Sequence, residues 1–532
     1  MHSLRDLDST EGTVQLHALT SDGHLILHPT PNPHDPNDPL RWPRWKKHVC
    51  FGSVCAFTFL TNYAIGGLAP AFYGLSIEFN KTQTETSALI LWPILVLGLF
   101  NFVWVPLANY FGKRPVFVLA SLLLSVCYLW GAVAQSFKSL LWSNIIAAFA
   151  GSTTEAVGVA TVNDLYFLHQ RGNMISIYNL AISGGNTIGP LICGFIITGT
   201  SWRVHKWIAF GLTFVNFVVV VLFCPETRYD RSGVRSIDSR GGPASSDTSP
   251  AASSAAEADH DSEKVHTTTA ATERSEPSST YDQLPKKSWR QQLSLYSGVP
   301  KDTSLVRLFI RPLPLIVYPA VILSFLGYAV SLAWVVAINI LNPFVLQAPP
   351  YNWAPSVNGL INITGLIGNV VGAWLGGWVV DKYSDWRSKK NGGVFEPESR
   401  LHLLIIPALI VPAGCLAFGY GVAYKLNWTA LFFGNGMVSV GLTFVPVATM
   451  TYVSDCYLPI NADALELVNG LKNIVAFGFL YGVIPWVTQA GYVDAYGTQA
   501  GVYVLVLLVT VVPIVVFGRK LRHISAGWKV IL

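Results

Sequence analysis

Twelve apolar stretches, each long enough to cross a bilayer, alternate with polar connections along the chain. A helix of ~20 apolar residues spans the hydrocarbon core, because backbone groups in lipid must form their hydrogen bonds within the segment. Six stretches precede a hydrophilic gap and six follow it, which predicts an all-α polytopic membrane protein of two pseudo-symmetric six-helix bundles. The predicted spans are 47–72, 86–107, 115–135, 139–163, 174–198, 206–224, 313–341, 355–380, 401–424, 428–453, 463–488 and 497–518.

Basic residues in the connections predict the orientation. They gather in alternate loops and in the tail, at Lys113, Arg114, His169, Arg171, Lys382, Arg387, Lys389, Lys390, Arg400, Arg519, Lys520, Arg522 and Lys529. The positive-inside rule then places both termini in the cytoplasm. The resulting division is a tail at 1–46, a bundle at 47–228, a cytoplasmic linker at 229–311, a second bundle at 312–518 and a tail at 519–532.

The linker has two parts of different composition. Residues 232–283 are rich in Ser, Thr, Ala and acids and are expected to be disordered, because they cannot bury enough apolar surface to fold. Residues 286–299 place Trp289, Leu293 and Tyr296 on one helical face, after basic residues. This pattern is typical of an amphipathic helix on the inner leaflet, and equally of a helix packed against the bundle.

The composition excludes several classes of function. Of the 532 residues 51% are hydrophobic and 12% are charged, whereas soluble domains carry ~25% charged residues. The net charge of +5 gives no indication of nucleic-acid binding, and the seven cysteines have no metal-ligand spacing. We expect no metal or other cofactor. The expected partners are the lipid bilayer, a small organic substrate and protons, with the monomer as the functional unit.

Two features concern insertion and modification. The segment Met1–Trp45 is polar and contains no signal peptide, so the first span is expected to serve as the insertion signal. Asn80-Lys-Thr is a glycosylation sequon in a connection that the topology places outside.

A related loop occurs at the same place in each half. The connection between spans 2 and 3 contains Asn109, Gly112, Lys113 and Arg114, and the one between spans 8 and 9 contains Gly376, Gly377, Asp381, Lys382 and Arg387. This repeat resembles the signature loop of the major facilitator superfamily. The resemblance implies that an acid at a helix end pairs with basic residues and latches the cytoplasmic gate. Asn109 stands where the family has the acid, whereas Asp381 retains it.

Span 5 contains a run of small residues that includes Gly185, Gly189, Pro190 and Gly194. Glycines let a neighbouring helix approach closely, and a proline removes one backbone hydrogen bond and bends the helix. In the superfamily a glycine–proline pattern in this span is associated with proton-driven antiporters, which implies export.

Further elements narrow the resemblance to the fungal twelve-span drug:proton antiporters. They are the segment 37–43 before span 1, Pro225-Glu-Thr-Arg228 after span 6, the segment 391–401 before span 9, and Pro485-Trp486 at the end of span 11.

Ionisable residues inside a membrane cost a few kcal/mol each and are candidates for function. Glu155 lies near the middle of span 4, which lines the central cavity in the superfamily. Proton coupling or cation binding is one interpretation of Glu155, and a structural hydrogen-bonding role is the other. Asp164 lies at the cytoplasmic end of that span, where a gating role is expected.

Span 11 places Glu466, Asn469 and Asn473 on one helical face, with Lys472 at its border. A lysine there needs a partner: a carboxylate such as Glu155 or Asp455, or an anionic group of the substrate. Polar lining is also expected from other cavity helices, at Asn62, Asn339, Asn435 and Tyr452.

The sequence therefore predicts a proton-coupled antiporter that exports a small organic compound, a drug or a secondary metabolite, by alternating access. It lies in the plasma membrane or in an internal membrane such as the vacuolar one. Proton-driven uptake of an organic cation such as a polyamine is the first alternative. A membrane-embedded transferase is a weaker one, because no His/Asp or Asp-rich metal motif accompanies the spans.

Overall fold

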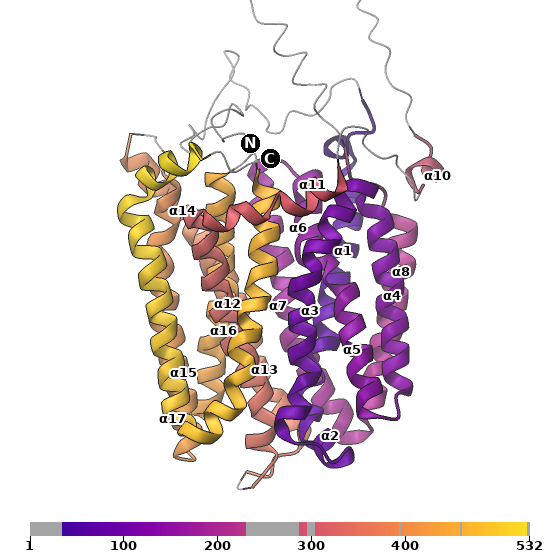
Figure 1. Cartoon of the computed structure of the whole chain (residues 1–532), viewed down its shortest axis with the longest axis vertical. Helices are drawn as coiled ribbons and strands as arrows, with labels where there is room; N and C mark the ends of the chain where they lie inside the picture. The colour runs from indigo at the N-terminus through magenta and orange to yellow at the C-terminus, as the bar shows by residue number, and fades with distance from the viewer. Residues whose placement is uncertain are drawn as a thin grey trace, which may run out of the picture.

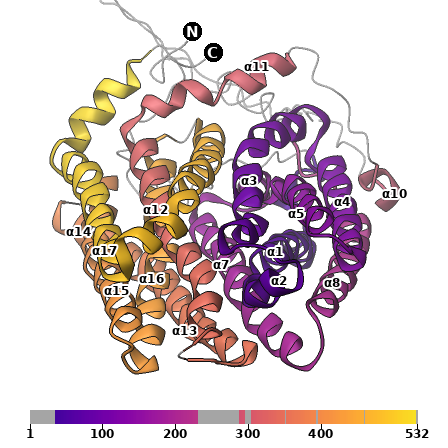
Figure 2. The same ribbon diagram turned by 60° about the horizontal axis from the view of Figure 1, so that its bottom comes forward.

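The computed structural model describes residues 35–229, 287–294, 304–349, 351–392, 395–457 and 460–528. Every regular element within these ranges is helical. The long helices run side by side in two groups, one from each half of the chain (Figures 1 and 2). The start of α1 and the end of α17 lie at the same end of the molecule, called here the terminal end. The expectation of an all-α membrane protein is confirmed.

The N-terminal half builds six spans, of which the first and the fourth are each made of two helices. In chain order they are α1 (Arg44–Gly66) with α2 (Phe72–Glu78), α3 (Gln83–Phe111), α4 (Lys113–Val133), α5 (Phe137–Gly151) with α6 (Thr153–Leu165), α7 (Leu168–Gly199) and α8 (Trp202–Phe223).

The C-terminal half builds the remaining spans. They are α12 (Pro319–Leu346), α13 (Pro355–Trp374) continued through a π-turn by α14 (Val380–Lys390), α15 (Ile405–Ala423) after a 3₁₀ segment (Pro397–Leu404), α16 (Trp428–Cys456) and α17 (Asn461–Ala526).

The helix α17 contains two spans, although it is continuous by hydrogen bonding. Its 66 residues would extend for ~100 Å, about three times the thickness of the hydrocarbon core. Gly491 breaks it with φ 82° and ψ 169°, a conformation that a side chain would disfavour. The chain reverses there at the end opposite the termini (Figure 1). Eleven helices of the described part are thus long and apolar enough to span, and the last provides both spans 11 and 12.

The glycines of span 5 bring α7 into backbone contact with two other helices. A Cβ at Gly185 would lie 2.5 Å from the Phe59 carbonyl oxygen, and one at Gly189 would lie 2.5 Å from that of Tyr63, both on α1. A Cβ at Gly194 would instead lie 2.5 Å from the carbonyl oxygen of Pro355, on α13 of the other half. The glycine run therefore fixes α7 against its own bundle and against the opposite one.

Part of the linker packs at the terminal end. Two short helices lie there, α10 (Trp289–Gln292) and α11 (Leu305–Ile310). In Figure 1, α11 and the 3₁₀ segment after it (Leu313–Val317) together run across the top of the molecule toward α12. Only 287–294 of the predicted surface helix lies within the described residues, and the segment 232–283 lies outside them. The last helix extends to Ala526, beyond the predicted end of span 12 at 518.

Hydrogen bonds attach the α10 segment to the N-terminal half. Lys46 Nζ donates to Gln292 Oε1 over 2.5 Å, and the Lys287 amide donates to Asn37 Oδ1 over 2.9 Å. Asp35 accepts hydrogen bonds from the Asn37 amide and the Tyr229 hydroxyl. Burial opposes ionisation of Asp35, but these donors and nearby Lys287 outweigh it and hold its pKa below the ordinary value.

Replacement of Gly189 by alanine is expected to destabilise the protein. The new Cβ would push against the backbone of α1, at a cost of about 1–3 kcal/mol for overpacking. Thermal unfolding of the purified protein measures this effect as a lower midpoint temperature. Gly184→Ala on the same helix is the control, because its Cβ would meet only the Phe59 ring at 3.7 Å. Equal midpoints for the two variants would contradict the close-contact account.

Candidate functional site

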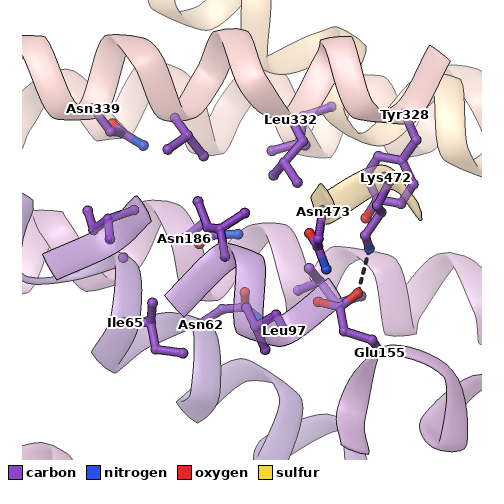
Figure 3. Close-up of a pocket in the computed structure, with 16 residues that line it drawn as sticks. Asn62, Ile65, Leu97, Glu155, Asn186, Tyr328, Leu332, Asn339, Lys472 and Asn473 are labelled. Carbon is purple, nitrogen blue, oxygen red and sulfur yellow. Dashed lines mark hydrogen bonds and ion pairs between the residues drawn. The ribbon is translucent and has the colours of Figure 1, made fainter. Parts of the chain in front are cut away.

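A cavity lies between the two halves and is lined by helices of both. Its walls are aliphatic apart from four amides, one tyrosine and one ion pair (Figure 3). The lining residues are Asn62, Ile65, Gly66, Ile90, Ile94, Leu97, Glu155, Ile182, Asn186, Tyr328, Leu332, Val336, Asn339, Leu442, Lys472 and Asn473.

The ion pair joins Glu155 of the N-terminal half to Lys472 of the C-terminal half. Lys472 Nζ lies 2.5 Å from Glu155 Oε2, and the two side chains are 1% and 4% exposed. The ammonium group also donates to Asn469 Oδ1 over 3.0 Å and lies 4.1 Å from the centre of the Tyr328 ring. Both charges are therefore almost entirely removed from water and compensate each other.

A local interruption of span 4 positions Glu155. Ser152, Thr153 and Thr154 each donate their hydroxyl to the carbonyl three residues earlier, which competes with the regular helical ladder. The span divides there into α5 and α6, and Glu155 stands in the first turn of α6. The positive end of that helix favours a carboxylate at this place.

The two halves contact each other on both sides of the cavity. Toward the terminal end, Asn101 Nδ2 of α3 donates to the Glu466 carbonyl of α17 over 2.9 Å. Toward the opposite end, Gln347 Nε2 donates to the Pro70 carbonyl and the Ser356 amide donates to Thr198 Oγ1, each over 2.9 Å. The cavity volume open to the centre of a water molecule is about 40 Å³, which holds a few waters. An organic substrate would require the halves to move apart.

The structure brings together five of the eight predicted coupling and substrate residues. Asn62, Glu155, Asn339, Lys472 and Asn473 line the cavity.

The other three predicted residues do not line it. Asn469 Oδ1 accepts a hydrogen bond from the Lys472 ammonium group. Asn435 Nδ2 donates to the Ile361 carbonyl, so this side chain ties α16 to α13. Tyr452 is 1% exposed and packs within the C-terminal half. Helical periodicity could not separate these residues from the lining, because it does not give the rotation of α16 relative to its neighbours.

Sequence reasoning missed Asn186 and Tyr328 as lining residues. Asn186 stands directly after Gly185, and the contact of α7 with α1 turns it toward Gly66, where a Cβ would lie 2.9 Å from Asn186 Oδ1. Tyr328 of α12 had no signal in the sequence beyond being an aromatic residue in an apolar span.

In the second half, the predicted latch residue Asp381 forms an ion pair with Arg400, at the start of span 9. The same guanidinium bonds Asp455 at the end of span 10, with Nε 2.7 Å from Oδ2. Beside this triad, Arg522 Nε lies 2.7 Å from Glu398 Oε1 and connects the end of span 12 to span 9. The predicted Arg387 is half-buried and does not join this network.

In the first half, Lys113 Nζ lies 2.5 Å from Asp164 Oδ2, which corresponds to the pairing of Arg400 with Asp455. The acid missing at Asn109 is replaced by Glu226, which follows span 6. Its carboxylate accepts hydrogen bonds from the backbone amides of Lys113 at 3.0 Å and Arg114 at 3.1 Å.

The Arg114 guanidinium in turn donates to the carbonyls of Cys224 and Val221 at the end of α8. Gly112 permits the approach of Glu226 with φ 105°, since a Cβ there would lie 2.4 Å from Glu226 Oε2. The acid that binds the start of α4 thus comes from after span 6 and not from the predicted latch loop.

Two further predictions concern the glycosylation sequon at Asn80 and metal binding. Asn80 is exposed, with φ 51°, in the connection before α3, at the end opposite the termini. Over the described residues, no group of three or more His, Cys, Asp and Glu side chains could hold a metal ion.

Comparison with protein families gives a match to the model described as "Major Facilitator Superfamily" over residues 53–465. This match extends from the first span into the eleventh and includes the cavity-lining parts of both halves except Lys472 and Asn473, just beyond its end.

Individual relatives are fungal. The chain is 26% identical to the MFS-type transporter C1271.10c of Schizosaccharomyces pombe, over 96% of this chain and 90% of that protein. It is 22% identical to "MFS antiporter QDR3" of Candida albicans, over 86% and 76% of the two chains. It is also 22% identical to "Efflux pump radE" of Floropilus chiversii, over 92% and 84%.

A solved structure shares the fold. A "POT family transporter" in complex with a thioalcohol-conjugated peptide aligns with a TM-score of 0.57 and 13% sequence identity, over 92% of this chain and 98% of the other. At this identity the likeness concerns the fold alone.

The hydrogen bonds of Glu226 to the start of α4 predict different effects for separate substitutions at Glu226 and at Asn109. Glu226→Gln removes a charged acceptor from two amides at the start of α4, and we expect a loss of about 1–3 kcal/mol in unfolding free energy. Asn109→Ala is the control and is expected to change stability by less than about 0.5 kcal/mol. Thermal unfolding measures both, and a larger loss for Asn109→Ala would show that the latch retains the family arrangement.

Proposed function

The chain belongs to the major facilitator superfamily, and we propose that it is a proton-coupled antiporter that exports a small organic compound by alternating access. The family consists of membrane transporters, which excludes the transferase alternative. The proposal rests on one observation above all: a buried ion pair at the cavity connects one half of the protein to the other.

The ion pair provides a physical reason for coupling. A charge in the membrane costs several kcal/mol without its partner, so the halves cannot separate at Glu155 and Lys472 while both are charged. A proton on Glu155 neutralises the carboxylate and removes most of the attraction. The halves can then part at the terminal end, and loss of the proton restores the pair.

The lining residues indicate the class of substrate. Aliphatic side chains form most of the wall, and four amides from different helices offer hydrogen-bond donors and acceptors. This combination fits an amphipathic organic molecule with a few polar groups. A multiply charged guest would find only one carboxylate and one ammonium, already paired with each other.

Three observations favour export. The glycine–proline run of span 5 packs against α1 in backbone contact, and this run is the element that the resemblance associates with antiporters. Two relatives carry the names antiporter and efflux pump. The basic residues collected at the terminal end favour placing that end in the cytoplasm, so that Glu155 receives protons from the opposite, outer side.

The alternative is proton-driven uptake of an organic cation. The specific observation in its favour is that Glu155 is the one carboxylate among the lining residues of the described cavity. A cationic amine could replace the Lys472 ammonium at Glu155.

Glu155→Gln tests the coupling. The variant keeps the shape of the side chain but cannot bind or release a proton, so gradient-driven transport in proteoliposomes should fall at least about tenfold and lose its pH dependence. Substrate counterflow, which needs no net proton movement, should persist. Asn62→Ala is the matched control: it changes the lining and the apparent affinity, but leaves the pH profile in place. An unchanged pH profile in Glu155→Gln would refute proton coupling at this residue.

Direction is tested in fungal cells with the gene deleted, using rhodamine 6G as an amphipathic probe and spermidine as a polyamine probe. Export predicts higher retention of the amphipathic probe in the deletion strain, reversed by the wild-type gene and not by Glu155→Gln. Reduced entry of spermidine in the deletion strain would favour the uptake alternative instead.

A further inference from the structure

A second carboxylic acid, Glu466, is buried between the halves and has no part in the mechanism described so far. It lies on α17, is 1% exposed, and is two helical turns from Lys472 toward the terminal end. Its Oε1 has no hydrogen-bond partner within the described residues. An ionised carboxylate in such a place is costly, whereas a protonated carboxyl is not.

The neighbours of Glu466 in α3 supply no cation. Asn101 Nδ2 donates to the backbone carbonyl of Glu466, and a Cβ at Gly470 would lie 2.4 Å from the Phe102 ring. Asn101 Oδ1 is itself buried without a donor within the described residues. The described residues thus leave two buried acceptor oxygens, Glu466 Oε1 and Asn101 Oδ1, without a hydrogen-bond donor.

The charged groups nearest to Glu466 lie toward the terminal end. Asp463 stands one turn away on the same helix, with its side chain 10% exposed. Arg311, which follows α11 in the linker, places its Nε 2.8 Å from Asp463 Oδ2 and is 37% exposed. This ion pair thus lies one helical turn from Glu466, toward the start of α17.

Polar side chains continue from Glu466 toward the cavity. Asn469 stands one turn further along α17, and its Nδ2 has no partner within the described residues, while its Oδ1 accepts from Lys472. Asp463, Glu466, Asn469 and Lys472 thus follow one another at three-residue intervals, a rise of ~4.5 Å per step. Each step also turns the side chain by about 60° around α17, so this series winds around the helix from near solvent to the ion pair with Glu155.

We propose that Glu466 is a second protonation site of the transport cycle, through which Glu155 exchanges its proton with the terminal side. The inference rests on the proposed proton coupling at Glu155. When α3 and α17 separate, water connects the two carboxyl groups; along α17, Glu466 lies ~9 Å from Lys472, the partner of Glu155. The proton of Glu155 then passes to a Glu466 carboxylate that has released its own proton to solvent past Asp463. One carboxylate becomes a carboxyl group as the other becomes a carboxylate, so no further reactant is needed.

Infrared difference spectroscopy of the full-length protein in lipid tests whether the buried Glu466 side chain is protonated. Wild type should show the C=O stretch of a protonated, buried carboxyl group at neutral pH. The band should be absent in Glu466→Gln, present in Glu155→Gln, and shifted but present in Glu466→Asp. A band that is unchanged in Glu466→Gln, or missing in wild type, would overturn the proposal.

A labelling experiment on the wild-type protein tests the protonation of Glu466 without depending on the folding of Glu466→Gln. Dicyclohexylcarbodiimide reacts with protonated carboxyl groups in apolar surroundings, where the acid adds across a C=N bond and rearranges to a stable acylurea. Mass spectrometry should find the adduct on Glu466 at neutral pH, and less of it at alkaline pH. An adduct on Glu155 but none on Glu466 would contradict the assignment.

The relay itself is tested by following the Glu155 C=O band after a rapid pH jump. Glu466→Gln should slow its appearance and disappearance by at least about tenfold. An equal rate in both proteins would leave Glu466 as a structural acid and end the proposal while coupling at Glu155 stands. A wild type in which Glu155 never titrates would instead refute the proposed function.

Discussion

The ion pair of Glu155 with Lys472 is the interaction on which the rest of the arrangement depends. Neither charge can face lipid or an apolar wall alone without a cost of several kcal/mol, so each holds the other in place. Because Glu155 belongs to one half and Lys472 to the other, their pairing also restrains the movement of the two halves relative to each other. In the proposed cycle, opening the cavity toward the terminal end requires a change at this pair, and a proton on Glu155 makes that change.

The predicted latches lie at the terminal end, one within each half. Both contain a basic residue at the start of one span bound to an acid at the end of the next, Lys113 with Asp164 and Arg400 with Asp455. The second contact of each latch differs in kind between the halves. Glu226 after span 6 holds the start of span 3, whereas Arg522 in span 12 holds Glu398 before span 9. The two halves therefore share a contact between corresponding elements, through backbone amides in the first half and through an ion pair in the second.

Much of this arrangement could be predicted from the sequence because it follows from local rules. Spans follow from runs of apolar residues, since lipid leaves the backbone no other partner. The small residues of span 5 predict close helix contacts, and the glycines make such contacts with α1 and α13. Glu155 and Lys472 stood out because a charge within an apolar span is rare. Asn435 and Tyr452 were predicted to line the cavity and do not. A polar residue in an apolar span can be recognised in the sequence, but the direction of its side chain cannot.

The sequence by itself determined that the chain spans a membrane with paired six-helix halves, and which few ionisable residues lie inside it. Those properties depend on the order of apolar and polar residues along the chain. Only the tertiary structure decided which residues meet: Glu155 with Lys472 over 317 positions, and Glu226 with the start of α4 in place of Asn109. The reason is that helix rotation and packing, which set these distances, depend on all neighbouring side chains at once and leave no local pattern in the sequence.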